Sequence, residues 1–295
     1  MEKRVCSVVV TYNRLGELKK CIQSLQNQSV KLDILIYDNA SMDGTEEWVK
    51  GLKEKYDNIL YYRSKINQGG AGGFCNGLKK AFEVGYDFYW LMDDDGRPYD
   101  KETLSRCLQA IVATEKVIVN PIVTPNKKDL SFPLLKYHKI NELLINEDVI
   151  NGISPFNGTL VTHQCVCELG FPKEEFFIKG DEREYSLRAM RSGYALITVK
   201  DAFFYHPQLE DKKIVLFGKE VLVTEESYWK EYYKARNYVY IYKKYYGVLG
   251  ILKHIVYCMI KLLLFRQDIK RKRKYLLQGI RDGLCNKYEN ITIVP

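Results

Sequence analysis

Short apolar runs and amphipathic segments alternate through the first hundred residues, and this alternation most limits the folds open to the chain. Apolar runs of five to seven residues predict buried strands, whereas apolar residues spaced three and four apart predict helices that bury one face. A strand–helix–strand order predicts an α/β fold, with a doubly wound parallel sheet between helices. Strands are expected at residues 5–11, 33–37, 59–63 and 86–92, and helices at 16–27, 45–56 and 76–84.

Polar residues follow each of the four predicted strands at the point where the strand ends. Because the carboxyl ends of parallel strands meet at one edge of a sheet, we expect these residues to lie close together. Four polar strand ends at one edge indicate a ligand-binding site. The groups are residues 11–14, 38–39, 67–73 and 93–95.

Three consecutive aspartates, Asp93, Asp94 and Asp95, end an apolar and aromatic run. Carboxylates gathered at one sheet edge repel one another unless a cation lies between them. Hard divalent cations such as Mg²⁺ and Mn²⁺ take oxygen ligands, and they commonly bind together with the phosphates of a substrate. A metal and nucleotide site is therefore the sharper interpretation. An aspartate-rich turn, continued by Gly96 and Pro98, is the alternative.

A glycine-rich segment, residues 67–77, follows the third predicted strand and precedes a helix. Backbone N–H groups in that position can hold a phosphate. The segment lacks the third glycine of the dinucleotide-binding fingerprint, because Cys75 occupies its place, and it lacks the ending of a P-loop. The glycines can still let the backbone approach a nucleotide-sugar. A tight contact between helix and sheet is the alternative.

Beyond residue 100 the pattern is less regular. Arg188 lies on a predicted helix and is expected to pair with a carboxylate, and His206 follows the last of the predicted strands. A lone histidine in such a place is more often structural than a ligand. The elements expected here are strands at 118–123, 157–162, 195–199 and 202–205, and a helix at 183–192, with an inserted segment between the first two strands.

The net charge of +8 is concentrated near the C-terminus, because residues 230–275 hold 13 lysines and arginines against two acidic residues. Within the nearly apolar 247–265, Lys253, His254 and Lys261 form one narrow stripe on a helical wheel. Two internal lysines argue against a membrane-spanning segment. A helix lying in the plane of an anionic membrane, followed by the basic 270–274, is the favoured interpretation. An oligomer or domain interface with a solvated basic tail is the alternative.

The cysteines and the N-terminus indicate a cytoplasmic protein. The eight cysteines include no C-x-x-C pair, and Cys6, Cys21 and Cys107 lie in apolar patterns, which predicts buried free thiols in a reducing compartment. Only four residues precede the first predicted strand, which is too short a segment for a signal peptide.

Taken together, these elements resemble an inverting family 2 glycosyltransferase of the GT-A fold. The galactofuranosyltransferases of bacteria are the most similar in residues 67–74 and 177–182, and related rhamnosyltransferases share much of the pattern. The resemblance implies a catalytic domain at 1–210, with a nucleotide-binding half at about 1–100 and an acceptor half at about 101–210. A helical, basic segment at 225–295 would serve membrane association or oligomerisation. The resembling motifs are 8–14, 38–45, 67–74, 93–95, 177–188 and 206–207, in this order.

The resemblance also implies roles for individual residues. Thr11 and Tyr12 would line the pocket of the base, and Asp38 would accept hydrogen bonds from the base or the ribose. Asp93, Asp95 and His206 would hold Mn²⁺ or Mg²⁺. The residues implied in binding the nucleotide-sugar are Thr11, Tyr12, Asn13, Arg14, Asp38, Asn67, Gly69, Gly70, Gly72, Gly73, Asp93 and Asp94.

Single displacement at an anomeric carbon needs a base for the acceptor hydroxyl and positive charge for the departing diphosphate. The metal ion would supply the charge. Glu182 stands where the resemblance implies a catalytic aspartate, and Asp181 before it is the second candidate base. The alternative for this pair is a favourable interaction with the N-terminal end of the helix dipole.

The expected function is the metal-dependent, inverting transfer of a hexosyl group to a lipid-linked surface polysaccharide. UDP-galactofuranose is the first candidate donor, and a rhamnosyltransferase that uses dTDP-rhamnose is the nearest alternative. A non-enzymatic binder of membrane or nucleic acid would not need carboxylates at several strand ends, and no nucleic-acid-binding motif is present. We expect a peripheral protein at the inner face of the cell membrane, with no nucleic-acid partner. Homo-oligomers stay open.

Overall fold

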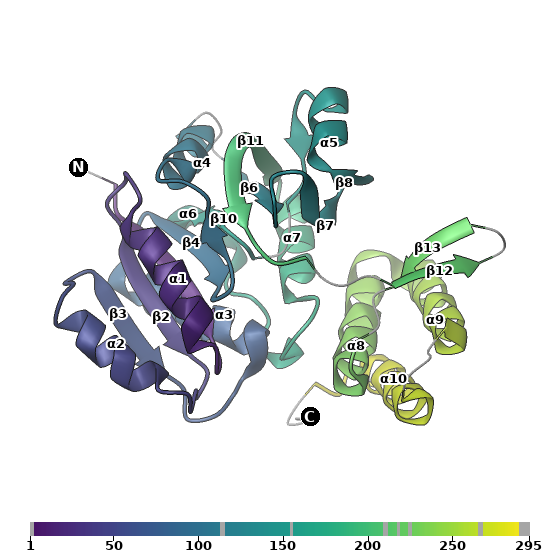
Figure 1. The fold of residues 1–295 in the computed structure, drawn as a ribbon. Helices are drawn as coiled ribbons and strands as arrows, with labels where there is room; N and C mark the ends of the chain where they lie inside the picture. The colour runs from purple at the N-terminus through teal and green to yellow at the C-terminus, as the bar shows by residue number, and fades with distance from the viewer. Residues whose placement is uncertain are drawn as a thin grey trace.

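A central sheet organises the chain up to residue 205. The computed structural model describes residues 3–112, 116–153, 156–208, 212–216, 219–223, 226–264 and 268–288. Nine strands of this described part form the sheet, in the order β3-β2-β1-β4-β10-β6-β11-β5 with β9 paired to β11 (Figure 1). They are β1 (Val5–Thr11), β2 (Asp33–Asp38), β3 (Ile59–Arg63), β4 (Phe88–Asp93), β5 (Arg97–Pro98), β6 (Val117–Thr124), β9 (Ile150–Asn151), β10 (Thr159–Thr162) and β11 (Ala195–Tyr205).

The first four strands run parallel, as predicted, and their ends meet at one edge. β1 lies between β2 and β4, so Thr11 is opposite Asp38 on one side and Val10 is opposite Asp93 on the other. β3 continues the parallel arrangement beyond β2. β10 runs antiparallel between β4 and β6, which makes the sheet mixed, and β11 returns parallel to β6.

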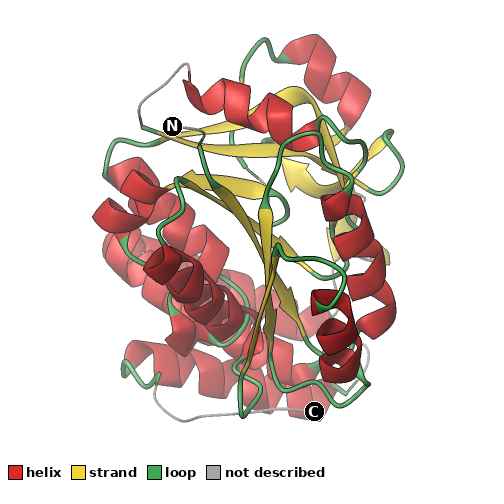
Figure 2. Ribbon diagram, turned by 90° about the vertical axis from the view of Figure 1, so that its left-hand side faces the viewer, coloured by secondary structure: helices red, strands yellow, loops and turns green. Residues whose placement is uncertain are grey.

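Helices cover both faces of the sheet (Figure 2). Alternate residues of β1 divide between two cores, because Val9 packs with Ile22 and Trp90 on one face while Val8 packs with Leu78 on the other. A strand buried on both faces produces this alternation. The first face carries α1 (Leu15–Gln26), α2 (Thr45–Lys53) and α4 (Thr103–Val112), and the second carries α3 (Gly69–Val84), α6 (His163–Leu169) and α7 (Asp181–Arg191).

The glycine-rich segment is helical, which corrects the prediction that this helix begins about two turns later. α3 begins at Gly69, whose N–H donates to the side chain of Asn67 at 2.8 Å. Small residues let the helix lie directly on β1: a Cβ at Gly77 would meet Val8 at 2.8 Å, and one at Gly73 would come closer still to β1. The tight helix–sheet contact, considered above as the alternative, accounts for Gly73 and Gly77.

The inserted segment between β6 and β10 forms a small lobe with its own core, in which Leu134, Ile140 and Leu143 pack against β6. β11 is one strand where two were predicted. Its pairing with β6 is irregular between Val199 and Phe203, and such a bulge interrupts the sequence pattern of a continuous strand. The lobe consists of β7 (Asp129–Leu134), β8 (Tyr137–Lys139), α5 (Ile140–Asn146) and β9.

Three helices follow a hairpin in the last third of the chain, and we call them the helical module (Figure 1). α10 packs along α8 so closely that a Cβ at Gly283 would lie 2.7 Å from the Arg236 carbonyl oxygen. The basic residues 270–274 form the first turns of α10, and four of the five are exposed, with only Lys272 buried. None of the described helices is both long and apolar enough to cross a bilayer. The elements are β12 (Lys212–Leu216), β13 (Lys219–Val223), α8 (Tyr228–Tyr245), α9 (Gly247–Leu264) and α10 (Ile269–Leu284).

Candidate active site

Asp93, Asp95 and His206 lie together, although they come from distant parts of the chain. Asp93 ends β4, Asp95 follows in the turn to β5, and His206 follows β11. The short β5 pairs with the end of β11, with Arg97 opposite Tyr205, and this pairing brings the histidine to the aspartates. One ligand atom from each of the three side chains lies within 4.8 Å of the other two. The structure thus brings the three predicted metal ligands together, and we call them the acidic cluster.

The acidic cluster fits a divalent cation. Asp95 Oδ1 is buried without a hydrogen-bond partner in the described part of the chain, and it lies 3.4 Å from His206 Nε2. His206 Nδ1 lies 2.7 Å from the carbonyl oxygen of Pro207, which can only accept, so in the neutral ring Nδ1 carries the proton and Nε2 has a lone pair. A cation between these facing acceptors would satisfy both. Two carboxylates and one imidazole suit Mn²⁺ or Mg²⁺.

The charged side chains of the acidic cluster shift one another's pKa values. Burial and then the charge of Asp95 raise the pKa of Asp93 to about 8. Burial alone would raise the pKa of Asp95 too, but His206 and Arg14 lower it below its ordinary value. Burial alone would lower the pKa of His206, and the two carboxylates outweigh this effect and raise it. Protons therefore compete with a metal ion for these side chains.

Asp94, the middle aspartate, has different partners. Its carboxylate accepts a hydrogen bond from Thr11 Oγ1 at 2.7 Å and lies 3.5 Å from Arg14 Nη1. Burial raises the pKa of Asp94 to about 6, against the opposing effects of Thr11 and Arg14. Arg14 also contacts Asp95 at 2.5 Å and leaves half of its side chain exposed. Asp94 thus joins the ends of β1 and β4, and Arg14 places a positive charge at the rim of the acidic cluster.

Asp38, which we expected to accept hydrogen bonds from the nucleobase or the ribose, is buried at the end of β2. It accepts hydrogen bonds from the Tyr61 hydroxyl at 2.6 Å and from the Ser41 N–H at 2.7 Å, and Arg63 lies 3.6 Å away. Sequence reasoning missed these three partners. Their signal was weak, because Tyr61 and Arg63 belong to a neighbouring strand whose register only the structure defines.

The other predicted nucleotide residues gather around the same ends of β1, β2 and α3. Tyr12 is 41% exposed, and Asn13 adopts a left-handed backbone with φ of 52°. The side chain of Asn13 accepts from the Met42 N–H at 2.7 Å, which links the loop after β1 to the loop after β2. Asn39 donates to the carbonyl of Gly69 at 3.0 Å and so joins β2 to the start of α3. Asn67, Gly70, Gly72 and Gly73 lie at this start or within its first turns.

Asp181 and Glu182 begin α7, after Gly180 with φ of 93°. Asp181 is buried and Glu182 is half-buried. Burial, followed by the charge of Glu182, raises the pKa of Asp181 well above its usual range, and Asp93 adds to the effect. One turn later Glu184 pairs with Arg188 at 2.7 Å, which confirms the ion pair expected for Arg188.

Helix α8 supports the loop that precedes α7, and sequence reasoning missed this contribution. Asn237 is fully buried, and its Nδ2 lies 2.9, 3.0 and 2.8 Å from the carbonyl oxygens of Phe176, Ile178 and Lys179. Arg236 is also buried and donates to the carbonyl of Glu175 at 2.7 Å. The only signal in the sequence was a polar pair within a tyrosine-rich helix.

The same loop touches the start of α3. Phe177 and Lys179 have positive φ values of 62° and 70°, a conformation that non-glycine residues adopt only when their surroundings enforce it. The carbonyl of Phe177 accepts a hydrogen bond from the Ala71 N–H at 3.0 Å. A Cβ on Gly69 would collide with that carbonyl group. We call residues 175–180 the bridging loop, because it connects the helical module, α7 and the start of α3.

Comparisons with known proteins identify the family of this chain. The family model described as glycosyl transferase family 2 matches residues 6–164. Galactofuranosyltransferase GlfT1 of Mycolicibacterium smegmatis is 33% identical over 251 residues, covering 80% of this chain and 82% of that protein. The dTDP-rhamnosyl transferase RfbF of Shigella flexneri is 24% identical over 290 residues, covering 95% of this chain and 94% of that protein.

Among solved structures, mannosyltransferase PcManGT of Pyrobaculum calidifontis, in complex with GDP-Man and Mn²⁺, matches with a TM-score of 0.59 at 14% identity. The match covers 97% of this chain and 88% of that one, and it shows the GT-A fold. By its family model and its similarity to GlfT1, the chain belongs to glycosyltransferase family 2 and is a hexosyltransferase.

Proposed function

We propose that this enzyme is a metal-dependent, inverting galactofuranosyltransferase that uses UDP-galactofuranose. The acidic cluster beside Asp38, at one edge of the sheet, is the observation that carries the proposal. Similarity to galactofuranosyltransferase GlfT1 over about four fifths of both chains supports the choice of sugar. Transfer to a lipid-linked glycan at the inner face of the cell membrane is the corresponding acceptor reaction.

The residues of the sheet edge would bind the donor. Asp93, Asp95 and His206 would hold Mn²⁺ or Mg²⁺, which when bound supplies positive charge to a departing diphosphate. Arg14 adds a second positive charge beside Asp95. The loops that follow β1 and β2 would hold the nucleobase and ribose. Asp38 orders the loop after β2 through the Ser41 N–H and joins it to β3 through Tyr61.

The start of α7 would act on the acceptor. Its hydroxyl oxygen attacks the anomeric carbon from the face opposite to the diphosphate, so that one C–O bond forms while the other breaks and the configuration inverts. Glu182 would take the proton of that hydroxyl. Asp181, whose pKa burial and the charge of Glu182 raise, would orient the acceptor through a hydrogen bond. If Glu182 is not the base, Asp181 is the other candidate.

A second donor follows from the second relative. The dTDP-rhamnosyl transferase RfbF is more distant in sequence but covers nearly the whole chain. A dTDP-rhamnose-dependent rhamnosyltransferase is therefore the alternative hexosyltransferase.

The test is a comparison of donors. Purified enzyme with Mn²⁺ or Mg²⁺ is offered UDP-galactofuranose, UDP-galactopyranose and dTDP-rhamnose, and nucleotide release and transfer to polyprenyl-linked glycans are measured. We expect turnover of UDP-galactofuranose, loss of turnover with chelator, and loss in Asp95→Asn but not in Asp201→Asn, whose aspartate is 74% exposed. Selective turnover of dTDP-rhamnose would transfer the proposal to the alternative, and metal-independent turnover would overturn the metal role.

The catalytic base is tested in a separate experiment. Glu182→Gln is expected to lower kcat by about 10²- to 10⁴-fold, the usual contribution of a general base, with little change in donor binding. Glu83→Gln, on the exposed side of α3, is the matched control. A larger loss in Asp181→Asn than in Glu182→Gln would assign the base to Asp181.

A further inference from the structure

Helix α9 has its polar and apolar sides reversed relative to a helix on a water-facing surface. His254 and Lys261 are only 4% and 5% exposed, and they face α8. Both carboxylate oxygens of Glu231 lie 2.7 Å from Lys261 Nζ, and the ring of His254 stacks on Tyr242 of α8. Burying these groups while apolar side chains remain outside indicates that the outer side meets something apolar.

The outer side of α9 forms one continuous apolar stripe. Its residues are spaced three and four apart, which places them within about 120° of one another around the helix. Each is at least 40% exposed, and Leu249 and Leu263 reach 74% and 78%. An exposed apolar patch of this kind marks an interaction site. The stripe consists of Val248, Leu249, Leu252, Val256, Met259, Ile260 and Leu263.

Positive charge adjoins the apolar stripe. A hollow of about 560 Å³ opens between α9 and α10, lined by Val256, Met259, Ile260, Leu262, Leu263 and, as its single charged residue, Arg273. Exposed Lys270, Arg271 and Lys274 lie within one turn of Arg273 on α10, and exposed Lys253 lies on α9 beside the stripe.

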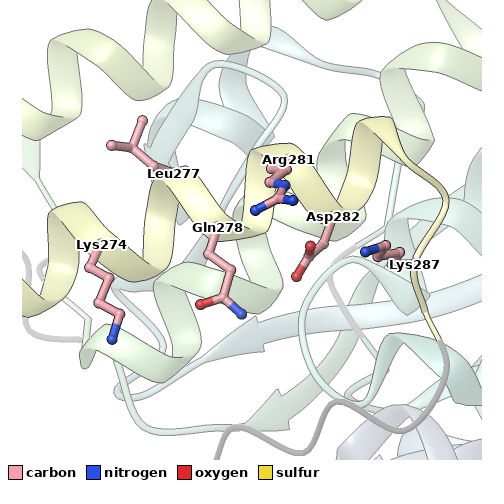
Figure 3. Close-up of a pocket in the computed structure, with 6 residues that line it drawn as sticks. All are labelled: Lys274, Leu277, Gln278, Arg281, Asp282 and Lys287. Atoms are coloured by element: carbon pink, nitrogen blue, oxygen red, sulfur yellow. The ribbon is translucent and has the colours of Figure 1, made fainter.

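A second hollow, along α10 and the residues that follow it, also contains Lys274 (Figure 3). Its cations are Lys274, Arg281 and Lys287, and its one acidic residue, Asp282, is engaged by the hydroxyl of Tyr232 at 3.0 Å. The other lining residues are Leu277 and Gln278.

We propose that the apolar stripe of α9 and the cations of α10 bind the surface of an anionic lipid bilayer, with α9 lying in the plane of the membrane. Apolar side chains then enter the acyl region while Lys and Arg pair with lipid phosphates, the arrangement of an interfacial helix. The alternative occupant, a second copy of this chain, fits less well. In a two-fold symmetric contact the same patch lies on both sides, so the cations of α10 would approach their own equivalents. The proposal does not depend on which sugar the enzyme transfers.

The test is co-sedimentation of the full-length protein with vesicles of phosphatidylcholine alone or of phosphatidylcholine and phosphatidylglycerol in equal parts. We expect binding to the anionic vesicles only, weakening as salt is raised. No binding to either vesicle would overturn the proposal, as would equal binding to both.

Leu249→Glu with Leu263→Glu should lower the vesicle partition constant by at least about tenfold, because both leucines leave the acyl region. Ile145→Glu, at an 83% exposed position on α5, is the matched control and should bind like the wild type. Thermal unfolding verifies that each variant is folded. If the double variant binds as well as the wild type, the proposal is wrong.

Lys270→Gln, Arg273→Gln and Lys274→Gln together should weaken binding by about fivefold for each charge removed. Sedimentation equilibrium without lipid tests whether a second copy of this chain covers the apolar stripe. A wild-type dimer that Leu249→Glu with Leu263→Glu dissociates, combined with no vesicle binding, would assign the stripe to a second copy. Nucleotide release from the donor is measured on the same samples, so that a failed donor assignment is distinguishable from failed membrane binding.

Discussion

The sheet edge and the helical module both bury charged and polar side chains, but they satisfy them differently. At the sheet edge, Asp95 Oδ1 is buried without a hydrogen-bond partner among the described residues, next to the lone pair of His206. In the helical module, Lys261 contacts both oxygens of Glu231, and Asn237 donates to the bridging loop. A buried polar group that lacks a partner marks a place for a ligand, whereas a satisfied one supports the structure.

The largest expected effect concerns the sheet edge, where Asp95 Oδ1 has no hydrogen-bond partner among the described residues. Asp95→Asn should reduce metal-dependent transfer by at least about a thousandfold, because charge stabilisation by a metal contributes several kcal/mol. Its thermal stability should change little, because relief of the repulsion at Asp93 opposes the loss of the charge interactions of Asp95 with Arg14 and His206. Steady-state kinetics and calorimetry measure the two quantities. Loss of stability with activity retained would mean that Asp95 is structural.

The helical module, where buried charges have partners, is tested at the ion pair of Lys261 and Glu231. Lys261→Met should destabilise the fold by about 3–5 kcal/mol, because it leaves Glu231 buried and unpaired. Lys261→Met with Glu231→Leu should recover most of that loss, since apolar replacements of both partners are often neutral. Chemical denaturation measures both variants. A double variant as unstable as the single one would show that the pair contributes more than mutual neutralisation.

A pH prediction follows from His254, the buried histidine of α9. Burial lowers its pKa to about 4, and the nearby Lys234 and Lys261 act in the same direction. The unfolded chain binds a proton at His254 near pH 6.5, and the folded chain does so only near pH 4. The contribution to stability is therefore complete above pH 6.5 and falls by about 3 kcal/mol between these values. The free energy of unfolding, measured by denaturation across this pH range, should rise with pH. His254→Gln should reduce that rise.

The smallest effect concerns the contact between the two regions. Asn237→Leu should lower kcat by about tenfold and stability by about 1–3 kcal/mol, because three loop carbonyls lose their donor. Donor KM should change little, since Asn237 contacts the loop before α7, where we propose that the acceptor binds, and not the ends of β1 and β2. Asn141→Leu, at an exposed position of α5, is the control. If Asn237→Leu raised the KM for the donor by the same factor as it lowered kcat, the bridging loop would take part in nucleotide binding instead.

The sheet edge could be predicted because its signals are local. Each strand and the polar residues at its end are adjacent in sequence, and parallel pairing brings Thr11, Asp38 and Asp93 together without further information. His206 is different. It reaches Asp95 only through the pairing of β5 with β11, so the resemblance to a family was needed to identify it.

The helical module was predictable in extent but not in orientation. The stripe of Lys253, His254 and Lys261 is visible on a helical wheel, yet a wheel does not say which side faces water. His254 and Lys261 face α8, and Lys253 lies at the exposed boundary. Asn237 could not be identified because its partners are backbone carbonyls, which have no residue-type signal.

The bridging loop also has a consequence for the order in which the protein forms during synthesis. Asn237 and Arg236, which hold the loop, are made about sixty residues after it, a delay of about 3–12 s at ordinary rates of translation. Until then the left-handed backbone at Phe177 and Lys179 lacks the hydrogen bonds from α8, although the carbonyl of Phe177 can already accept from the Ala71 N–H. A nascent chain can therefore complete the sheet edge first, and the loop before α7, where we propose that the acceptor binds, is held in place only when α8 has emerged and docked.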